Sequence, residues 1–182
     1  MIVWILVGIV VLLALIFFGY YNRFTILINR IENSLGQIDV QLKRRADLIP
    51  NLVESVKGYA KHESSTIKAV TEARKLLMSA KGIENKIKAD AKLEGALGKL
   101  FAIAEAYPDL KANTNFLELQ RELTATEDRV AYSRQFYNDS ILSYNNKCKT
   151  FPGKIFAGMY GFKEKEYLKI VESERKAVKV SF

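Results

Sequence analysis

The chain opens with an unbroken apolar run. Every residue from Ile2 to Phe18 is apolar or glycine, and the first charged side chain is Arg23. At about 1.5 Å of rise per residue, roughly twenty such residues cross the hydrocarbon layer of a bilayer. The run lacks the basic start and the small-residue cleavage site of a signal peptide, and it lacks the polar face of an ordinary core helix. We therefore expect residues 1–21 to form a transmembrane anchor.

Beyond the anchor, apolar side chains recur at alternating steps of three and four, which is the spacing of a core-facing helical stripe. The first stripe continues from the anchor to about Tyr59 and has Arg45 at one of its positions. Pro50 lies inside this stripe and predicts a kink rather than an end. Turn signals then separate three further helices, which we expect at about residues 64–81, 84–107 and 116–150.

These helices are long and the turns between them are short. Such helices bury their stripes most simply as an antiparallel bundle, and the absence of Val/Thr-rich alternation argues against sheets. The predicted fold is therefore all-α, with the N-terminal transmembrane helix continuing into an antiparallel bundle of the four-helix type. The expected organisation is an anchor at 1–21, a helical bundle at 22–150 and an apolar, charged C-terminal tail at 151–182.

The net charge is +8, with Lys and Arg interleaved among Glu and Asp almost everywhere. Such interleaving is typical of solvated helix faces and argues against a nucleic-acid partner. The excess of positive charge suits a domain beside anionic lipid. Arg23, Arg30 and the basic residues 43–45 follow the apolar run, and no Lys or Arg precedes it. The positive-inside rule then places the N-terminus outside the cell membrane and the bundle in the cytoplasm.

Catalytic and metal-binding residues are scarce. Cys148 is the only cysteine and His62 the only histidine, so an internal disulfide is excluded and a zinc site is not expected. Glu118, Glu122, Glu127 and Asp128 resemble part of a carboxylate-bridged metal site, but the chain has no Glu-x-x-His pair. We expect no metal, no cofactor and no enzymatic activity.

One polar concentration surrounds Pro50 and is a candidate interaction surface. Its residues are Asp39, Lys43, Arg44, Asp47 and Asn51. Asp39 and Lys43 are four residues apart, as are Lys43 and Asp47, so they can pair along one helical face. The surface either docks a partner or is a solvated face whose charges hold a kinked helix together.

The tail contains a second candidate surface. Residues 151–162 are apolar, flanked by lysines and interrupted by glycines, which makes the segment a poor helix former. Ile155, Phe156, Met159 and Phe162 are its large apolar side chains. They either contact lipid or a protein, or fold back and plug the open end of the bundle.

Several stretches resemble the LemA family of bacterial membrane proteins. The most specific is Arg44-Arg45-Ala46-Asp47-Leu48-Ile49-Pro50-Asn51-Leu52-Val53, and residues 21–23, 29–33, 37–54, 104–113 and 131–139 add to it. The resemblance implies an N-terminal membrane span with the N-terminus outside and a long-helix bundle in the cytoplasm. It implies no recognised catalytic motif.

The function that fits these features is that of a non-enzymatic, single-pass membrane protein whose cytoplasmic bundle scaffolds or recruits partner proteins. The alternative is a self-assembling homo-oligomer that organises or shapes the membrane. The expected partners are the lipid bilayer and proteins that the sequence does not identify, with homo-oligomerisation left open.

Overall fold

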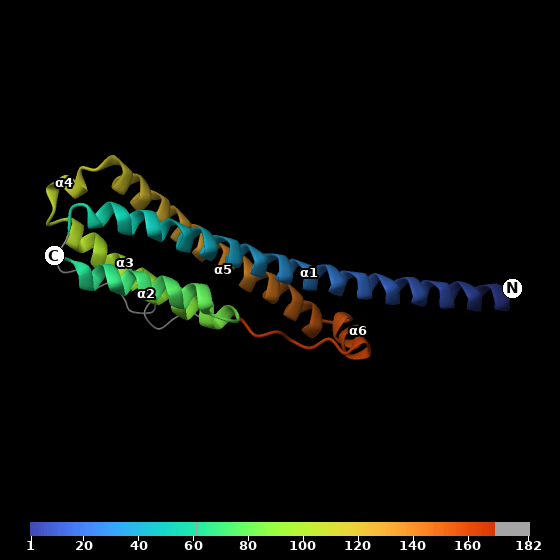
Figure 1. The fold of residues 1–182 in the computed structure, drawn as a ribbon. Coiled ribbons are helices and arrows are strands. Elements are labelled where there is room, and N and C mark those ends of the chain that lie inside the picture. The colour runs from blue at the N-terminus through green and yellow to red at the C-terminus, as the bar shows by residue number, and fades with distance from the viewer. Residues whose placement is uncertain (61, 170–182) are drawn as a thin grey trace, which may run out of the picture. The chain divides into compact units, whose positions relative to one another are not determined.

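The computed structural model describes residues 1–60 and 62–169, which fold into helices joined by turns (Figure 1). The long helices are α1 (Ile2–Lys57), α2 (Ser64–Ser79), α3 (Ile83–Ala104) and α5 (Thr114–Lys149), and the short ones are α4 (Pro108–Lys111) and α6 (Gly153–Tyr160). No strand occurs in these described residues, so the all-α prediction is confirmed. Two compact units share α1 and α5: an anchor unit, Met1–Gly36 with Arg134–Leu168, and a body unit, Gln37–Ser133.

Helix α1 begins in the apolar run and continues without a break for 56 residues, through Pro50. It is the one helix in the described chain that is long and apolar enough to cross a membrane. The side chains of residues 2–16 are all exposed in the isolated chain. A bilayer would cover these apolar side chains, because no other part of the anchor unit does. The predicted continuity of the anchor with the first bundle helix is confirmed.

The body unit has a core formed by four helices. Leu42, Ile49, Leu52 and Val56 of α1 are buried, together with Val70 and Leu77 of α2, Leu93, Leu97 and Leu100 of α3, and Leu123 and Val130 of α5. These positions follow the three–four spacing seen in the sequence, so one stripe from each helix faces the core. Burying each of these aliphatic side chains stabilises the unit by roughly 1.5–3 kcal/mol before conformational entropy is counted.

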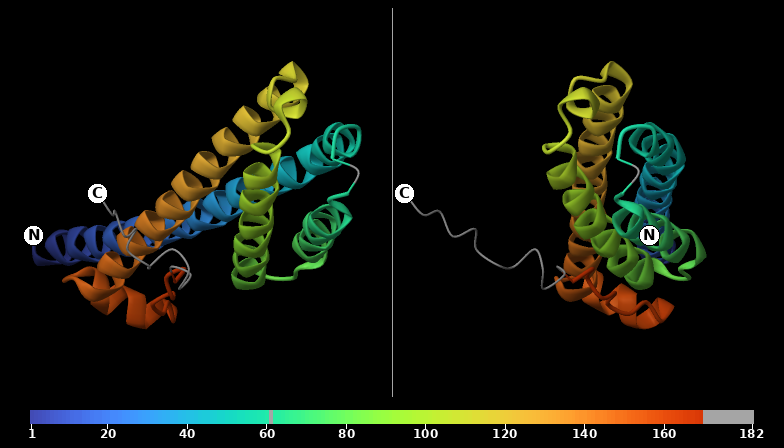
Figure 2. Two further views of the ribbon diagram at one scale, coloured as in Figure 1. Left: turned by 90° about the vertical axis from the view of Figure 1, so that its left-hand side faces the viewer. Right: turned by 60° about the vertical axis from the view of Figure 1, so that its left-hand side comes forward.

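Helices α2 and α3 form a hairpin in the body unit (Figures 1 and 2). The turn between them contains Gly82, whose φ of 77° is a left-handed conformation that glycine adopts without a Cβ clash. Helix α3 ends at Ala104, and Pro108 then starts the short α4, which the sequence analysis did not predict. Proline suits this first helical position because the N–H that it lacks would have no partner inside the helix.

Helix α5 runs antiparallel to α1 in the body unit. Tyr59, near the end of α1, accepts a hydrogen bond from Asn113 just before α5, whereas Arg44, earlier on α1, pairs with Glu122 further along α5. Asn113 also caps α5, since its Oδ1 accepts a 3.0 Å hydrogen bond from the backbone N–H of Phe116. These two contacts define the register of α5 against α1 and agree with the predicted antiparallel arrangement.

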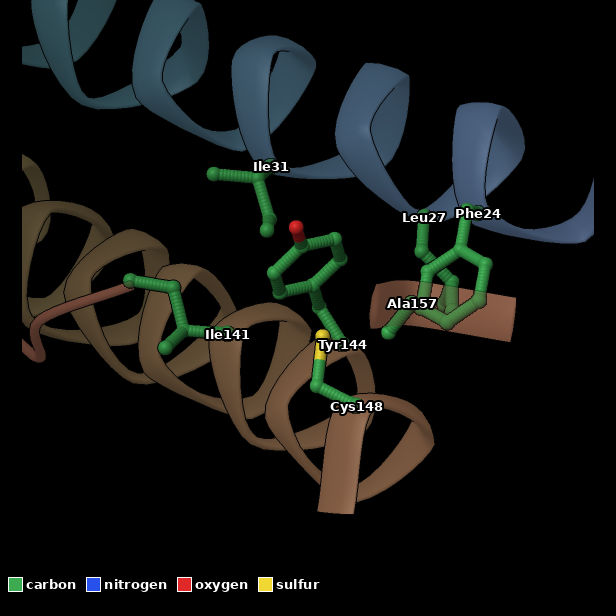
Figure 3. Packing of buried hydrophobic residues seen from close by; sticks show 7 residues of the cluster. All are labelled: Phe24, Leu27, Ile31, Ile141, Tyr144, Cys148 and Ala157. Carbon is green, nitrogen blue, oxygen red and sulfur yellow. The ribbon is translucent and has the colours of Figure 1, made fainter. Parts of the chain in front are cut away.

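The anchor unit has its own core. Phe24, Leu27 and Ile31 of α1 meet Ile141, Tyr144 and Cys148 of α5, with Ala157 of α6 beside them (Figure 3). Helix α6 forms although its glycines make the segment a poor helix former. Its position is fixed by contacts with α1 and α5, and such tertiary packing overrides the low helix propensity of its glycines.

Candidate interaction surfaces

The polar residues around Pro50 lie on α1 in the body unit and connect it to other helices. Asp39 forms a 2.8 Å ion pair with Lys86 of α3, and Arg44 forms a 3.0 Å ion pair with Glu122 of α5. The sequence analysis expected such pairs along α1 itself. Lys43, Asp47 and Asn51 are exposed and lie four residues apart, so they form a polar strip on one face of α1.

A groove lies beside this strip. It has a volume of about 410 Å³ and is lined by Leu48, Asn51 and Ser55 of α1 and by Asn115, Glu118, Leu119 and Glu122 of α5. The lining combines two leucines with amide, hydroxyl and carboxylate groups. This composition suits a polypeptide segment that carries both apolar and basic side chains.

Arg45, next to this surface in sequence, points the other way and is only 2% exposed. Its Nη1 pairs with Asp90 of α3 at 3.0 Å, and its Nη2 pairs with Glu127 of α5 at 3.2 Å. The guanidinium thus joins three helices. Asp90 is nearly as buried as Arg45, whereas Glu127 is about half exposed. Arg45 is thus the charged position within the otherwise apolar stripe of α1, and these ion pairs compensate its charge.

A second hollow lies alongside the Arg45 network. Its volume is about 430 Å³, and its lining includes Gly95, Gly98 and Phe101 of α3 together with Arg45 and Glu127. The two glycines leave open space, because a Cβ at either would meet no atom within 4 Å. Within the described residues, the buried Nε of Arg45 has no hydrogen-bond partner.

Arg74 of α2 has a role that the sequence analysis missed. Proline has no backbone N–H, so Pro50 cannot bond to the carbonyl oxygen of Ala46. In the structure, the Nε of Arg74 donates to that oxygen at 2.8 Å. A side chain from another helix thus satisfies a buried acceptor that would otherwise be stranded. The bond forms only because α1 and α2 pack together, so no local sequence pattern predicts it.

In the anchor unit, aromatic side chains gather where the apolar run ends. Phe156 of α6 stacks on Tyr20 with a centroid distance of 4.4 Å. Tyr160 meets Phe17 at 4.9 Å and donates a hydrogen bond to the Phe17 carbonyl oxygen. Phe162 lies 5.0 Å from Phe24. These contacts attach α6 to the part of α1 that leaves the apolar run.

The four apolar tail residues of the predicted surface therefore separate into two pairs. Phe156 and Phe162 are half-buried against α1, whereas Ile155 and Met159 are exposed. Gly153 allows α6 to start close to the end of α5, since a Cβ there would collide with the backbone carbonyl of Lys147. The structure brings the tail onto α1 and α5 and leaves one face of α6 uncovered.

Beyond α6, the chain is held on α5 by two asparagines. Asn145 accepts from the backbone N–H of Lys165 and donates to its carbonyl, both at 2.9 Å. Asn138 makes the same pair of bonds with Leu168, at 2.9 and 3.1 Å. Asn138 and Asn145 are seven residues apart on α5, which is a helical rise of about 10.5 Å. Lys165 and Leu168 are three residues apart, and an extended chain spans about 10 Å over three residues, so the distance between the two asparagines matches the distance between their partners. We call these two residues the asparagine clamps.

Cys148 and Tyr144 are two titratable groups of the anchor core that burial perturbs. Burial raises the pKa of the Cys148 thiol. Burial, with a smaller contribution from neighbouring Cys148, raises the pKa of Tyr144 to about 12. Both groups stay neutral at physiological pH, so Cys148 has the properties of a structural thiol rather than of a nucleophile.

The chain also matches known proteins. The sequence model of the LemA family matches residues 34–182. The magnetosome protein MamQ of Magnetospirillum gryphiswaldense is 28% identical over 173 residues, which cover 81% of this chain and 64% of that protein. Protein LemA of Metamycoplasma hominis is 30% identical over 147 residues, covering 76% of this chain and 65% of that protein.

The chain thus spans less than two thirds of the length of these relatives. The family match begins beyond the apolar run and takes in the rest of α1 and all later helices. It agrees with the resemblance carried by the motif around Pro50. The chain belongs to the LemA family and is a membrane-associated helical protein.

Proposed function

We propose that this protein is a non-enzymatic, single-pass membrane protein whose body holds partner proteins at the cytoplasmic face of the cell membrane. The observation that carries the proposal is the groove between α1 and α5 in the body unit. It lies on the same helix that begins in the membrane, so a segment bound there is tethered to the bilayer. The names of the relatives denote no enzyme, which agrees with this role.

The chemistry of the groove defines its partner. Leu48 and Leu119 offer apolar contact, while Glu118 and Glu122 place carboxylates on the α5 side. Arg44 already pairs with Glu122, but both side chains are largely exposed and such pairs exchange partners at little cost. The expected partner is therefore a polypeptide segment with apolar and basic side chains.

Site-specific photocrosslinking in native membranes tests this docking site. A photoreactive phenylalanine analogue is introduced at Asn51, which lines the groove, and at Leu76, an exposed position on α2, as the matched control. We expect discrete crosslinks to other proteins from position 51 and none from position 76. A ladder of the protein crosslinked to itself would favour the self-assembling alternative, and equal products from both positions would contradict the groove.

Orientation is a separate part of the proposal. Arg23 and Arg30 follow the apolar run directly, with the basic residues 43–45 beyond them, which supports a cytoplasmic body. Protease added to cells stripped of their outer envelope should spare the body and digest it only after lysis. Digestion of the body in intact stripped cells would reverse the assigned orientation.

A further inference from the structure

We propose that α6 is a second membrane contact. Its exposed face enters the boundary between headgroups and acyl chains of the leaflet in which the apolar run of α1 ends. This inference goes beyond the docking groove, which lies in the body unit, and it depends only on the apolar run spanning the membrane.

The first step is that α6 has two different faces. Gly153 and Ala157 are buried, and Phe156 and Tyr160 are half-buried against α1. On the opposite face, Ile155 and Met159 are 54% and 63% exposed, and they are four residues apart in the helix, so they line one side of it. Phe151, just before the helix, is 83% exposed. We call these three residues the apolar stripe.

The second step is the depth of α6. Its buried face contacts Phe17, Tyr20 and Tyr21, which are the last residues of the apolar run and the first aromatics after it. Tyrosines at the end of a span lie at the level of the headgroups. A helix packed sideways on these residues lies at the same depth, so its outward face meets lipid.

The third step is charge. Residues 151–163 contain no acidic side chain, and Lys154 and Lys163 are exposed within this segment. The Nζ of Lys147 lies 4.4 Å from the centre of the Tyr20 ring, which places another cation at this level. An apolar stripe with lysines around it is the composition of helices that lie in the membrane interface and favour anionic lipids.

A fluorescence experiment on the full chain tests the proposal. The protein carries Cys148→Ala, which removes the native thiol, and a single new cysteine at Ile155, at Met159 or at the control position Leu142. Leu142 is also an exposed apolar residue of the anchor unit, at 47% exposure, but it lies on α5 away from α6. Each cysteine is labelled with an environment-sensitive dye in nanodiscs that hold one chain each.

We expect the dye at positions 155 and 159 to emit at shorter wavelength than at position 142. We also expect lipids with a nitroxide near the headgroup to quench it more than lipids with a nitroxide at the chain end. Water-like emission without lipid quenching at 155 and 159 would overturn the proposal, as would equal quenching at all three positions. Shielding from a soluble quencher without lipid quenching would instead place another protein segment on the stripe and also overturn it.

Discussion

Arg45 shows how one residue can connect the body unit. It occupies a core position on α1, and its guanidinium is held by carboxylates from two other helices. A buried ion pair contributes little net stability compared with apolar packing, but removing one partner leaves the other charge without compensation. Arrangements of α1, α3 and α5 that separate these charges should therefore cost more than the observed one.

Replacing this residue gives a sharp contrast with its neighbour. Arg45→Ala should destabilise the protein by about 3–5 kcal/mol, because the buried Asp90 loses its 3.0 Å ion pair with the guanidinium. Arg44→Ala is the matched control and should cost less than about 1 kcal/mol, since the Arg44–Glu122 pair is exposed. Unfolding followed by circular dichroism measures both. Equal losses of stability would show that Arg45 is solvated.

Cys148 offers a second test at this scale. Its thiol is buried and its pKa is raised, so less thiolate is present at pH 7 to 8 than for a free cysteine. Alkylation by a maleimide should therefore be slower in the folded protein than in denaturant, because the thiol is both buried and less ionised in the fold. The rate in the folded protein should still rise with pH above 9. Equal rates in the folded and denatured states would contradict the anchor core.

At the level of single residues, sequence reasoning found positions more readily than partners. It placed Arg45 on the apolar stripe, because helical periodicity is local. It considered Glu127 within a group of acids that resembles part of a metal site, and it did not foresee Asp90, since ion pairs between helices depend on how each helix is rotated in the bundle. The same holds for Arg74, which bonds to Ala46 on another helix, 28 positions away in the sequence.

At the scale of elements, α1 illustrates how a helix tolerates an internal proline. Pro50 removes one backbone bond, and Arg74 of α2 replaces it with a side-chain bond. The continuity of α1 through this point is thus a property of two helices together. The sequence analysis predicted that α1 would continue, but it had no means of identifying what compensates the proline.

A double-mutant cycle measures this compensation. Arg74→Ala should destabilise the protein by about 1–3 kcal/mol, because the Ala46 carbonyl loses its donor. In a Pro50→Ala background the loss should be smaller, since the new amide at position 50 can bond to that carbonyl. Chemical unfolding of the four proteins gives the coupling energy. Strict additivity would show that the bond does not depend on the proline.

The asparagine clamps explain the order of the segment after α6. Asn145→Ala should remove two hydrogen bonds to Lys165, while Asn146→Ala, at an exposed neighbouring position, removes no such pair. Limited trypsin digestion should therefore cut at Lys163 and Lys165 faster in the Asn145 variant than in the control, because cleavage requires local release of the backbone. Identical cleavage rates would mean that the clamp does not hold the chain.

Helix α6 marks the limit of prediction for elements. The long helices α1, α2, α3 and α5 follow from their apolar periodicity, and their ends follow from turn residues. Helix α6 has three glycines within or next to it, so local propensity indicated only a poor helix former. Contacts with Phe17, Tyr20 and Phe24, far away in the sequence, provide what the local sequence lacks.

At the scale of the whole molecule, the membrane span also serves as part of the fold. The body unit contains its own core and its own ion-pair network, whereas the anchor unit uses Phe17, Tyr20 and Tyr21 to hold α6. Removing the span should therefore affect the two units differently.

A chain that begins at Arg23 should remain strongly helical by circular dichroism, because the core of the body unit is complete without the span. Trypsin should cut it after Lys154 faster than a chain that begins at Ile16 and keeps the aromatic contacts of α6. Low helicity of both truncated chains would contradict a self-sufficient body unit. Equal cleavage after Lys154 would contradict the role of Phe17 and Tyr20.

The contact between Tyr160 and Phe17 also sets an order of events during synthesis. The two residues are 143 positions apart, and the apolar run is made first. At about 5–20 residues per second, the ribosome needs roughly 7–30 s to produce the remainder. During that interval the span can already reside in the bilayer while the aromatic face at its end has no covering helix. A nascent chain that stalls before α6 would present Phe17, Tyr20 and Phe24 without the aromatic side chains that cover them in the complete protein.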